Sequence, residues 1–258
     1  MGDYVLFEMW SGYRDTVISR HDFYVEQAQA RLFSQFNNIE NESENYAETW
    51  LEKNSNRFNP DRHDPGEFEE QAYDESIGFY DLLSGLRDTT RLAVTAGMFH
   101  EWDKQLRVWL AAQIQHWRRG QAAQDAIWNA NFSDLMDLLE GYGWSFRNQD
   151  FHKKLDTLRL VVNAYKHGLG AAFSALRLSN PEYFDTKIQD SLGTPFEYQR
   201  LDHTHLKVSD EQFRIFAEAI RTFWVTVPET LSESQVIYTP KWIAKAFRSD
   251  EKQNSENA

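Results

Sequence analysis

Residues 147–168 contain the side chains best suited to chemistry. A helix is expected from residue 149 to about residue 165, and at about 100° per residue one of its faces, continued to residue 167, is polar and is built from residue types that bind ligands or transfer protons. This polar stripe comprises His152, Asp156, Arg159, Asn163, Lys166 and His167. The opposite face is apolar and comprises Phe151, Leu155, Leu158, Val161, Val162 and Tyr165. An amphipathic helix of this kind buries its apolar face and leaves its polar stripe accessible.

The polar stripe allows two interpretations. The pattern alone favours the simpler one, a solvated helical face with no further role. Arg159, Asn163 and His167, however, follow one another at intervals of four residues, and asparagine and histidine are less suited to helix interiors than the glutamate, glutamine and lysine of ordinary solvated faces. His167 also stands at the expected helix end, before Gly168, where the helix dipole favours a charged imidazole.

The charge of the chain is unevenly distributed. The formal net charge is −13, and residues 1–100 account for −11 of it. Between residues 147 and 168, by contrast, five basic side chains face two acidic ones. A uniformly basic surface for nucleic acid is therefore excluded, whereas a confined basic site on this one helix is allowed.

The segment LRLVVNAYKHG, residues 158–168, resembles the active helix of HEPN domains. These are helical bundles, commonly dimeric, and many are metal-independent ribonucleases of toxin–antitoxin and antiviral systems. Their motif is an arginine, four to six intervening residues and a histidine, often with a polar residue directly after the arginine. Asn163 and His167 match the polar residue and the histidine, while Arg159 lies one residue outside the arginine window.

The resemblance implies a mechanism and a set of site residues. His167 would act as general acid or base in RNA transesterification, Arg159 and Lys166 would stabilise the negative transition state, and Asn163 would orient the phosphate or the imidazole. His152, Lys153 and Lys104 are further candidates for substrate binding, and no metal or other cofactor is expected. The displaced arginine keeps a second hypothesis open, a non-catalytic module of the same type that binds a nucleotide or a protein.

The elements expected around this helix make the chain an all-α protein, a helical bundle of HEPN type. A helix over residues 16–54 forms an N-terminal extension, and a second, broken at Ser84-Gly85, spans residues 67–119 with Trp102, Trp109 and Trp117 on one stripe as core or dimer seam. Residues 186–208 form an irregular insertion with a strand at 206–208, before a helix that Ser209 caps. A small helix around Trp242 and a disordered tail at residues 249–258 complete the chain. The expected units are residues 1–66, the bundle 67–228 and the C-terminal segment 229–258.

Composition excludes several other classes of protein. The chain has no cysteine, which removes disulfide scaffolds, thiolate metal sites and cysteine nucleophiles. The longest uncharged apolar stretch, residues 92–99, is too short to span a bilayer, so a cytoplasmic protein is expected. Asp202, His203 and His205 show no third metal ligand nearby in sequence, so no metal site is assigned there. The expected partners are RNA or a nucleotide, a second copy of the chain, and a protein that docks on the acidic N-terminal region. A third hypothesis is a structural or interaction protein, in which the acidic first 100 residues dock a partner or mimic the charge of nucleic acid.

Overall fold

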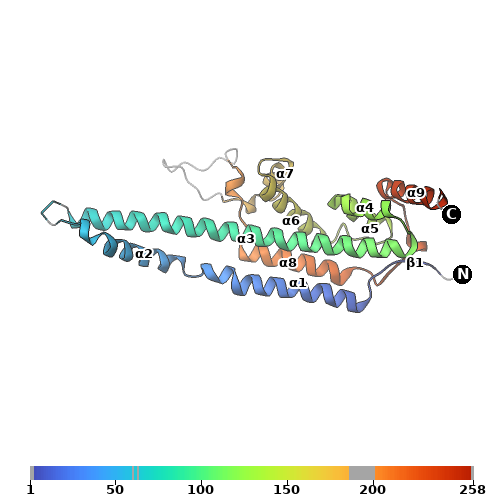
Figure 1. Cartoon of the computed structure of the whole chain (residues 1–258), viewed down its shortest axis with the longest axis horizontal. Helices are drawn as coiled ribbons and strands as arrows, with labels where there is room; N and C mark the ends of the chain where they lie inside the picture. Colours follow the sequence, from blue (N-terminus) through green and yellow to red (C-terminus); the bar gives the residue numbers. More distant parts are fainter. Residues whose placement is uncertain (1–2, 60, 63, 186–200, 257–258) are drawn as a thin grey trace.

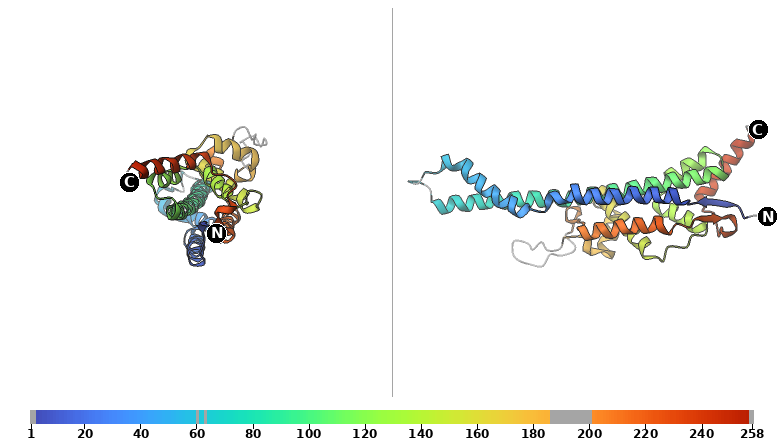
Figure 2. Two further views of the ribbon diagram at one scale, coloured as in Figure 1. Left: turned by 90° about the vertical axis from the view of Figure 1, so that its right-hand side faces the viewer. Right: turned by 90° about the horizontal axis from the view of Figure 1, so that it is seen from below.

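The computed structural model describes residues 3–59, 61–62, 64–185 and 201–256. It is mostly helical, which confirms the expected all-α class apart from one small sheet. A single long helix, α3 (Pro65–Trp117), runs through the elongated molecule, and most of the other helices pack along it (Figures 1 and 2). The order of the main elements is β1 (Val5–Glu8), α1 (Ser11–Arg31), α2 (Ile39–Asn54), α3, α4 (Gln121–Asn129), α5 (Phe132–Gly141), α6 (Asp150–His167), α7 (Ala171–Ser179), α8 (Asp210–Thr226), β2 (Thr230–Ser232) and α9 (Lys241–Glu256).

Helix α3 is continuous, so the break expected at Ser84-Gly85 is wrong. Asp64 caps its start by accepting a hydrogen bond from the Gly66 amide, and Pro65 occupies the first turn, where a missing N–H costs nothing. An interior glycine weakens a helix by only about 1 kcal/mol, which the packing of a helix roughly 80 Å long outweighs. Trp102 and Trp109 are buried in the core and Trp117 packs against it, so this stripe is core.

The first expected helix is in fact two. A short 3-10 turn at Phe33–Phe36 separates α1 from α2, because Phe33 turns inward and packs edge-on against Phe213 of α8 at 5.0 Å. Helix α1 then lies along α3 and α8, while α2 packs antiparallel against the N-terminal half of α3. The pair α2–α3 projects from the rest of the molecule as a hairpin (Figure 1).

The C-terminal part of the chain differs from the expectation. Strands β1 and β2 pair antiparallel, Phe7 opposite Leu231, and thereby join residues near the two ends of the chain. Helix α9 continues to Glu256, so the expectation of a disordered tail from residue 249 is wrong as far as the description reaches. Between residues 201 and 208 the described backbone forms a 3-10 turn at His203–His205 and one isolated bridge from Leu206 to Phe184 in place of the expected strand. Residues 186–200 of the expected insertion lie outside the described residues.

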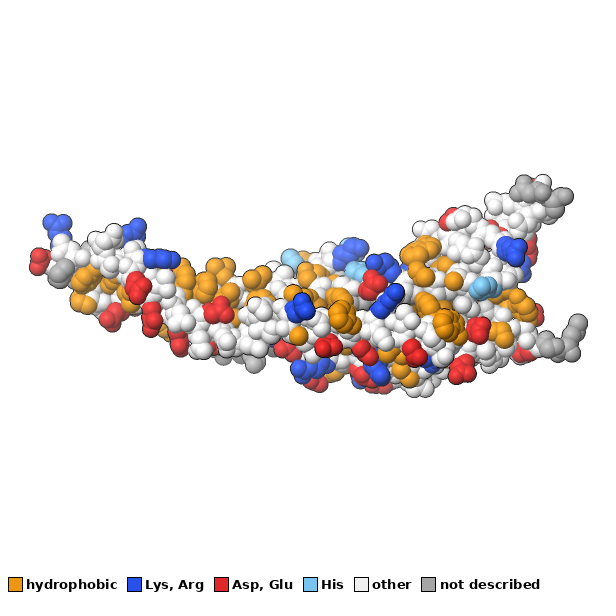
Figure 3. Space-filling view, turned by 60° about the horizontal axis from the view of Figure 1, so that its bottom comes forward, with side chains coloured by type: hydrophobic (Ala, Val, Ile, Leu, Met, Phe, Trp, Pro, Cys, Tyr) orange, Lys and Arg blue, Asp and Glu red, His pale blue; other side chains and the backbone are white. Residues whose placement is uncertain are grey.

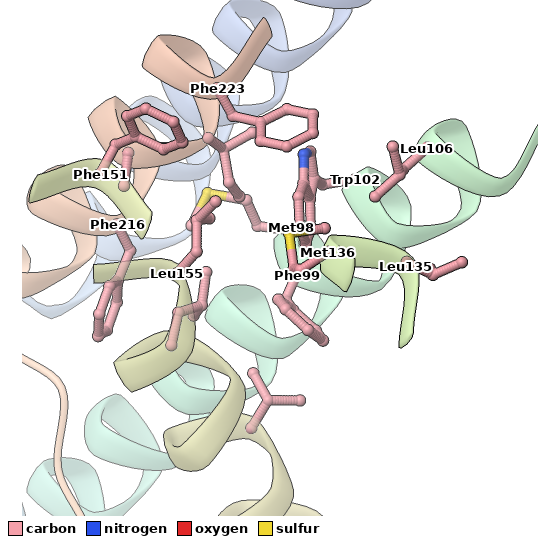
Figure 4. Packing of buried hydrophobic residues seen from close by; sticks show 14 of the residues in the cluster. Met98, Phe99, Trp102, Leu106, Leu135, Met136, Phe151, Leu155, Phe216 and Phe223 are labelled. Carbon is pink, nitrogen blue, oxygen red and sulfur yellow. The ribbon is translucent and has the colours of Figure 1, made fainter. Parts of the chain in front are cut away.

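The core that holds α6 in place is aromatic and lies between α3, α5, α6 and α8. Figure 4 shows Trp102 and Met98 of α3 beside Phe223 of α8, with Phe151 and Leu155 of α6 on the other side. The rings of Trp102 and Phe223 meet edge to face at 5.2 Å, and Leu155 is completely buried. This core fixes the rotation of α6 and therefore the direction of its polar face.

Candidate functional site, a groove along helix α6

Helix α6 forms where the amphipathic pattern predicts it and buries the predicted face. Phe151, Leu155, Leu158, Val161 and Val162 are all buried. Tyr165, expected on the same face, is instead 38% exposed. The helix ends at Gly168, which adopts a positive φ of 64° that favours glycine.

The polar stripe of α6 forms one wall of an open groove of about 590 Å³. Helices α3 and α5 form the other walls, and Arg147 of the loop before α6 also lines the groove. The stripe contributes His152, Asp156, Arg159 and Asn163; the other lining residues are Phe99, His100, Asp103, Arg107, Asn131, Phe132, Ser133, Met136 and Arg147. Figure 3 shows basic, acidic and histidine side chains gathered near the middle of the molecule, with hydrophobic side chains on both sides.

Arg159 is held in place by two neighbours. Its Nε and Nη2 atoms lie 2.8 and 2.7 Å from Oδ1 of Asp156, one turn earlier on the helix. Its guanidinium carbon lies 5.7 Å from the centre of the Phe132 ring, within the range of a cation–π contact. The side chain is 29% exposed, so a ligand in the groove can still reach it.

The two other arginines of the groove are also paired with carboxylates. Arg107 binds Asp103 at 2.7 Å and donates hydrogen bonds to the carbonyls of Ile127 and Ala130, which ties α3 to the end of α4. Arg147 pairs with Glu140 and lies 3.4 Å from Asp137, both on α5. The groove is therefore nearly balanced in charge, which suits a ligand with one or two negative groups better than a long polyanion.

His152 is an aromatic wall of the groove as well as a titratable group. Its ring stacks with Phe132 at 6.4 Å and meets the edge of Phe146 at 5.3 Å. Burial, together with the nearby charge of Arg147, lowers the pKa of His152 below the ordinary value of 6.5. The imidazole is therefore neutral at pH 7, with one nitrogen able to donate and the other able to accept a hydrogen bond.

Lys166 and His167 lie beyond the groove. Both are exposed at the C-terminal end of α6, one turn after Asn163, and neither lines the groove. The 3-10 turn at His203–His205 lies beside this end: a methyl group placed on Gly168 would be 3.8 Å from Cγ of His203. The predicted stripe is thus divided into a groove with His152, Arg159 and Asn163 and an exposed tip with Lys166 and His167.

The two predicted lysines outside the motif are surface residues. Lys153 is exposed and does not line the groove. Lys104 is also outside the lining and forms an ion pair of 3.1 Å with Glu101, both side chains being more than half exposed. The neighbouring His100 and Arg107 of α3 do line the groove, so this face of α3 meets α6 through residues other than Lys104.

Sequence reasoning missed the contribution of α5. Phe132 contacts both Arg159 and His152 but belongs to a helix whose own pattern indicates only an N-cap, with Asn131 accepting a hydrogen bond from the Asp134 amide. No local signal connects Phe132 to residues twenty or more positions later, because helical periodicity carries no information on which helices meet.

The described residues contain no cluster of three or more histidine, aspartate or glutamate side chains that could hold a metal ion. Asp202 and His205 serve the local turn, since Asp202 accepts hydrogen bonds from the amide and hydroxyl of Thr204. These bonds lower the pKa of Asp202 to about 2. Among the helices of the described part, none is both long and apolar enough to cross a membrane.

Comparison with known proteins gives no relative, so a function can be argued only from the residues of the site. No protein-family model matches the chain, and the searches of curated proteins and of solved structures found no match.

Proposed function

We propose that this protein is a HEPN-like helical module that binds a nucleotide, free or as one residue of an RNA strand, in the groove along α6. One observation carries the proposal: Arg159, Asn163 and His152 of α6 line a single open groove together with the ring of Phe132. These are the groups that nucleotide recognition needs, a guanidinium for a phosphate, an amide for a base edge and aromatic surface for stacking.

The balance of charge in the groove determines the kind of ligand. Each arginine has a carboxylate partner, so an incoming phosphate shares the guanidinium of Arg159 with Asp156 and gains only part of its attraction. Stacking and base-edge hydrogen bonds must supply the remainder of the affinity. A mononucleotide offers both, whereas inorganic phosphate offers neither.

Calorimetric titration with AMP, GMP, CMP and UMP at low salt tests this proposal. At least one nucleotide should bind, and Arg159→Gln should weaken binding about tenfold or more, the size of one charge-assisted hydrogen bond. Lys153→Gln is the matched control, because it removes the same charge from an exposed position of the same helix. The proposal fails if no nucleotide binds, or if the two variants lose affinity equally.

A second candidate function, a metal-independent ribonuclease of a defence or toxin–antitoxin system, is favoured by the exposed tip of α6. Lys166 and His167 lie three and four residues, about 5 and 6 Å, past Asn163, and both are exposed. An RNA strand with one nucleotide in the groove would place a neighbouring phosphate at this tip. His167 would take the 2′-hydroxyl proton, and O2′ would form the bond to phosphorus as the bond to O5′ breaks. The leaving O5′ would take a proton from water, and the protonated His167 would return its proton to the solvent, giving a 2′,3′-cyclic phosphate. In a homodimer, the partner's copy of the tip would supply a second histidine.

Incubation with tRNA in the presence of EDTA tests the ribonuclease candidate. Cleavage should occur without metal, should leave cyclic phosphate ends and should be lost in His167→Ala. His116→Ala, a substitution at another exposed histidine, should cleave at the rate of the wild type. Cleavage that persists in His167→Ala would assign the activity elsewhere, and nucleotide binding without any cleavage would leave the binding module as the function.

A further inference from the structure

The hairpin of α2 and α3 carries an exposed apolar stripe that no part of the described chain covers. Tyr73 is 63% and Ile77 42% exposed, and Tyr80, one turn further along α3, is partly exposed. The three residues are spaced i, i+4 and i+7, so they form one continuous face of the helix. Figure 3 shows hydrophobic side chains at the surface along this projecting end of the molecule.

Helix α2 does not cover the stripe because it packs on a different face of α3. Ala72 and Ser76 are buried beneath α2, Ser43 donates a hydrogen bond to the carbonyl of Ser76, and the rings of Tyr46 and Phe79 stack at 4.4 Å. At 100° per residue, this packed face is centred about 100° from the stripe. The stripe is therefore an uncovered face of α3 beside α2, on which a third helix could pack.

Acidic side chains border the stripe on the side away from α2. Glu70, Asp74 and Asp81 lie about 50–90° from its centre, and all three are exposed. None of them forms an ion pair within the described part of the chain, whereas Asp88 further along α3 pairs with Arg87, Arg91 and Lys207. Helix α2 adds five exposed glutamates, Glu40, Glu42, Glu44, Glu48 and Glu52.

From these observations we infer that the stripe Tyr73–Ile77–Tyr80 is a docking surface for a basic amphipathic helix of a partner protein. The apolar face of the partner helix would cover the stripe, and its lysines or arginines would lie opposite Glu70, Asp74 and Asp81. Charge complementarity selects this partner. A second copy of the hairpin would bring acidic residues against acidic residues, since residues 39–81 hold only Lys53, Arg57 and Arg62 as basic side chains. This surface is separate from the groove along α6, so the inference does not depend on the nucleotide site.

Three synthetic peptides of 18 residues make the first test, measured by fluorescence anisotropy. One is an amphipathic leucine–lysine helix, the second a scrambled sequence of the same composition without an apolar face, and the third an amphipathic leucine–glutamate helix. Only the amphipathic basic peptide should bind saturably in a one-to-one complex, and added salt should weaken its binding because exposed charges contribute. Equal binding of the scrambled peptide would overturn the inference, because it would reduce the interaction to unspecific charge attraction.

Paired variants on α3 place the binding surface. Ile77→Ser should weaken the basic peptide about tenfold, whereas Leu82→Ser, at a residue 75% exposed on the opposite side of the helix, should leave affinity unchanged. Glu70→Gln should weaken binding and its matched control Glu75→Gln, which faces away from the stripe, should not. All four positions are solvent-exposed or partly so, and the circular dichroism of each variant checks that the hairpin is retained. Equal effects within each pair would overturn the inference.

Sedimentation of the protein alone provides the remaining test. The wild-type protein and Ile77→Ser should sediment as the same species, because the stripe does not mediate self-association. A concentration-dependent dimer that Ile77→Ser abolishes would assign the stripe to a second copy and overturn the inference of a basic partner.

Discussion

The guanidinium carbon of Arg159 lies 5.7 Å from the centre of the Phe132 ring, so a cationic side chain of α6 is held against an aromatic ring of α5 across the groove. Asp156 fixes the other edge of the same guanidinium through an ion pair of 2.7 Å. Arg159 is thus positioned in advance, which lowers the entropic cost of binding a ligand, but part of its charge is neutralised. The fixed position of Arg159 strengthens the binding of a phosphate, whereas the partial neutralisation of its charge weakens it.

Neutralising Asp156 should therefore strengthen nucleotide binding. In Asp156→Asn the amide still holds a hydrogen-bonding oxygen near Arg159, while the groove gains one unit of positive charge. We expect a several-fold lower dissociation constant for the nucleotide that binds the wild type, and a steeper loss of affinity with salt. Calorimetric titration at two salt concentrations measures both.

Asp150→Asn is the control for this prediction. It changes the net charge by the same amount on the same helix, but Asp150 pairs with Lys154 at 2.7 Å and lies outside the groove. An equal gain in affinity in both variants would show that the overall charge matters and that Arg159 is not the phosphate ligand.

Local sequence patterns predicted the helices that their own residues determine. The amphipathic spacing around Arg159 gives α6 nearly to its ends, and Ser209 caps α8 as expected, accepting a hydrogen bond from the Gln212 amide. Both features depend on residues within one or two turns of each other. The acidic, polar segment after residue 249 contains no such local signal, which is why α9 was missed there.

The groove could be predicted only in part, because its two halves are brought together by long-range packing. The sequence places His152, Arg159 and Asn163 on one face, but the meeting of that face with Phe132 and His100 depends on the core around Trp102 and Phe223. The sequence also groups His167 with Arg159, because a helical projection gives only the direction of each side chain around the helix axis. It carries no information on where the neighbouring helices end. In the structure, α3 and α5 form a groove that ends near Asn163 and leaves His167 outside.

Gly97 allows α1 and α3 to approach each other, which gives a second prediction. A methyl group at Gly97 would lie 2.7 Å from the hydroxyl of Tyr24, which donates a hydrogen bond to the carbonyl of Val94. In a free helix, Gly→Ala gains about 1 kcal/mol, but at this position the overlap should outweigh the gain. We expect Gly97→Ala to lower the free energy of unfolding in wild type and to raise it in a Tyr24→Phe background, where the hydroxyl is absent.

Urea denaturation of the two single variants and the double variant measures this coupling. Gly85→Ala is the reference, because the same helix has open space at that position and the substitution should stabilise the protein by about 1 kcal/mol. The contact between Tyr24 and Gly97 would be disproved as a constraint if Gly97→Ala stabilised the wild type as much as Gly85→Ala does.

The third prediction concerns Asp250, which anchors α9. Its buried carboxylate accepts hydrogen bonds of 2.9 Å from the amides of Ala122 and Ala123, at the start of α4. Gly120 leaves the space for it, since a Cβ at that position would overlap the carboxyl group. The interaction combines an N-cap with a charge at the positive end of a helix dipole, so Asp250→Ala should lower the free energy of unfolding by about 1–2 kcal/mol.

Chemical denaturation of Asp250→Ala and of its neighbour Glu251→Gln separates this cap from ordinary surface charge. Glu251 pairs with Arg118 at the surface, where the two side chains are 56% and 39% exposed, so its loss should cost at most about 1 kcal/mol. If Asp250→Ala proved no more damaging than Glu251→Gln, the carboxylate would not be the group that holds α9 to α4.

The pH dependence of stability follows from His152 and is the fourth prediction. Burial and the charge of Arg147 lower the pKa of His152 in the folded state below 6.5, its ordinary value in an unfolded chain. Below about pH 6.5 the unfolded state therefore binds more protons than the folded state, so the free energy of unfolding must fall as the pH falls. His21, buried and donating a hydrogen bond to the carbonyl of Ala217, has its pKa lowered by burial as well and adds to the same loss.

The free energy of unfolding in urea should thus be lower at pH 5.5 than at pH 7.5. In His152→Gln this difference should shrink without vanishing, because His21 remains, while the exposed substitution His116→Gln should leave it at the wild-type value. A difference in His152→Gln as large as in the wild type would show that the groove does not disfavour the charged imidazole.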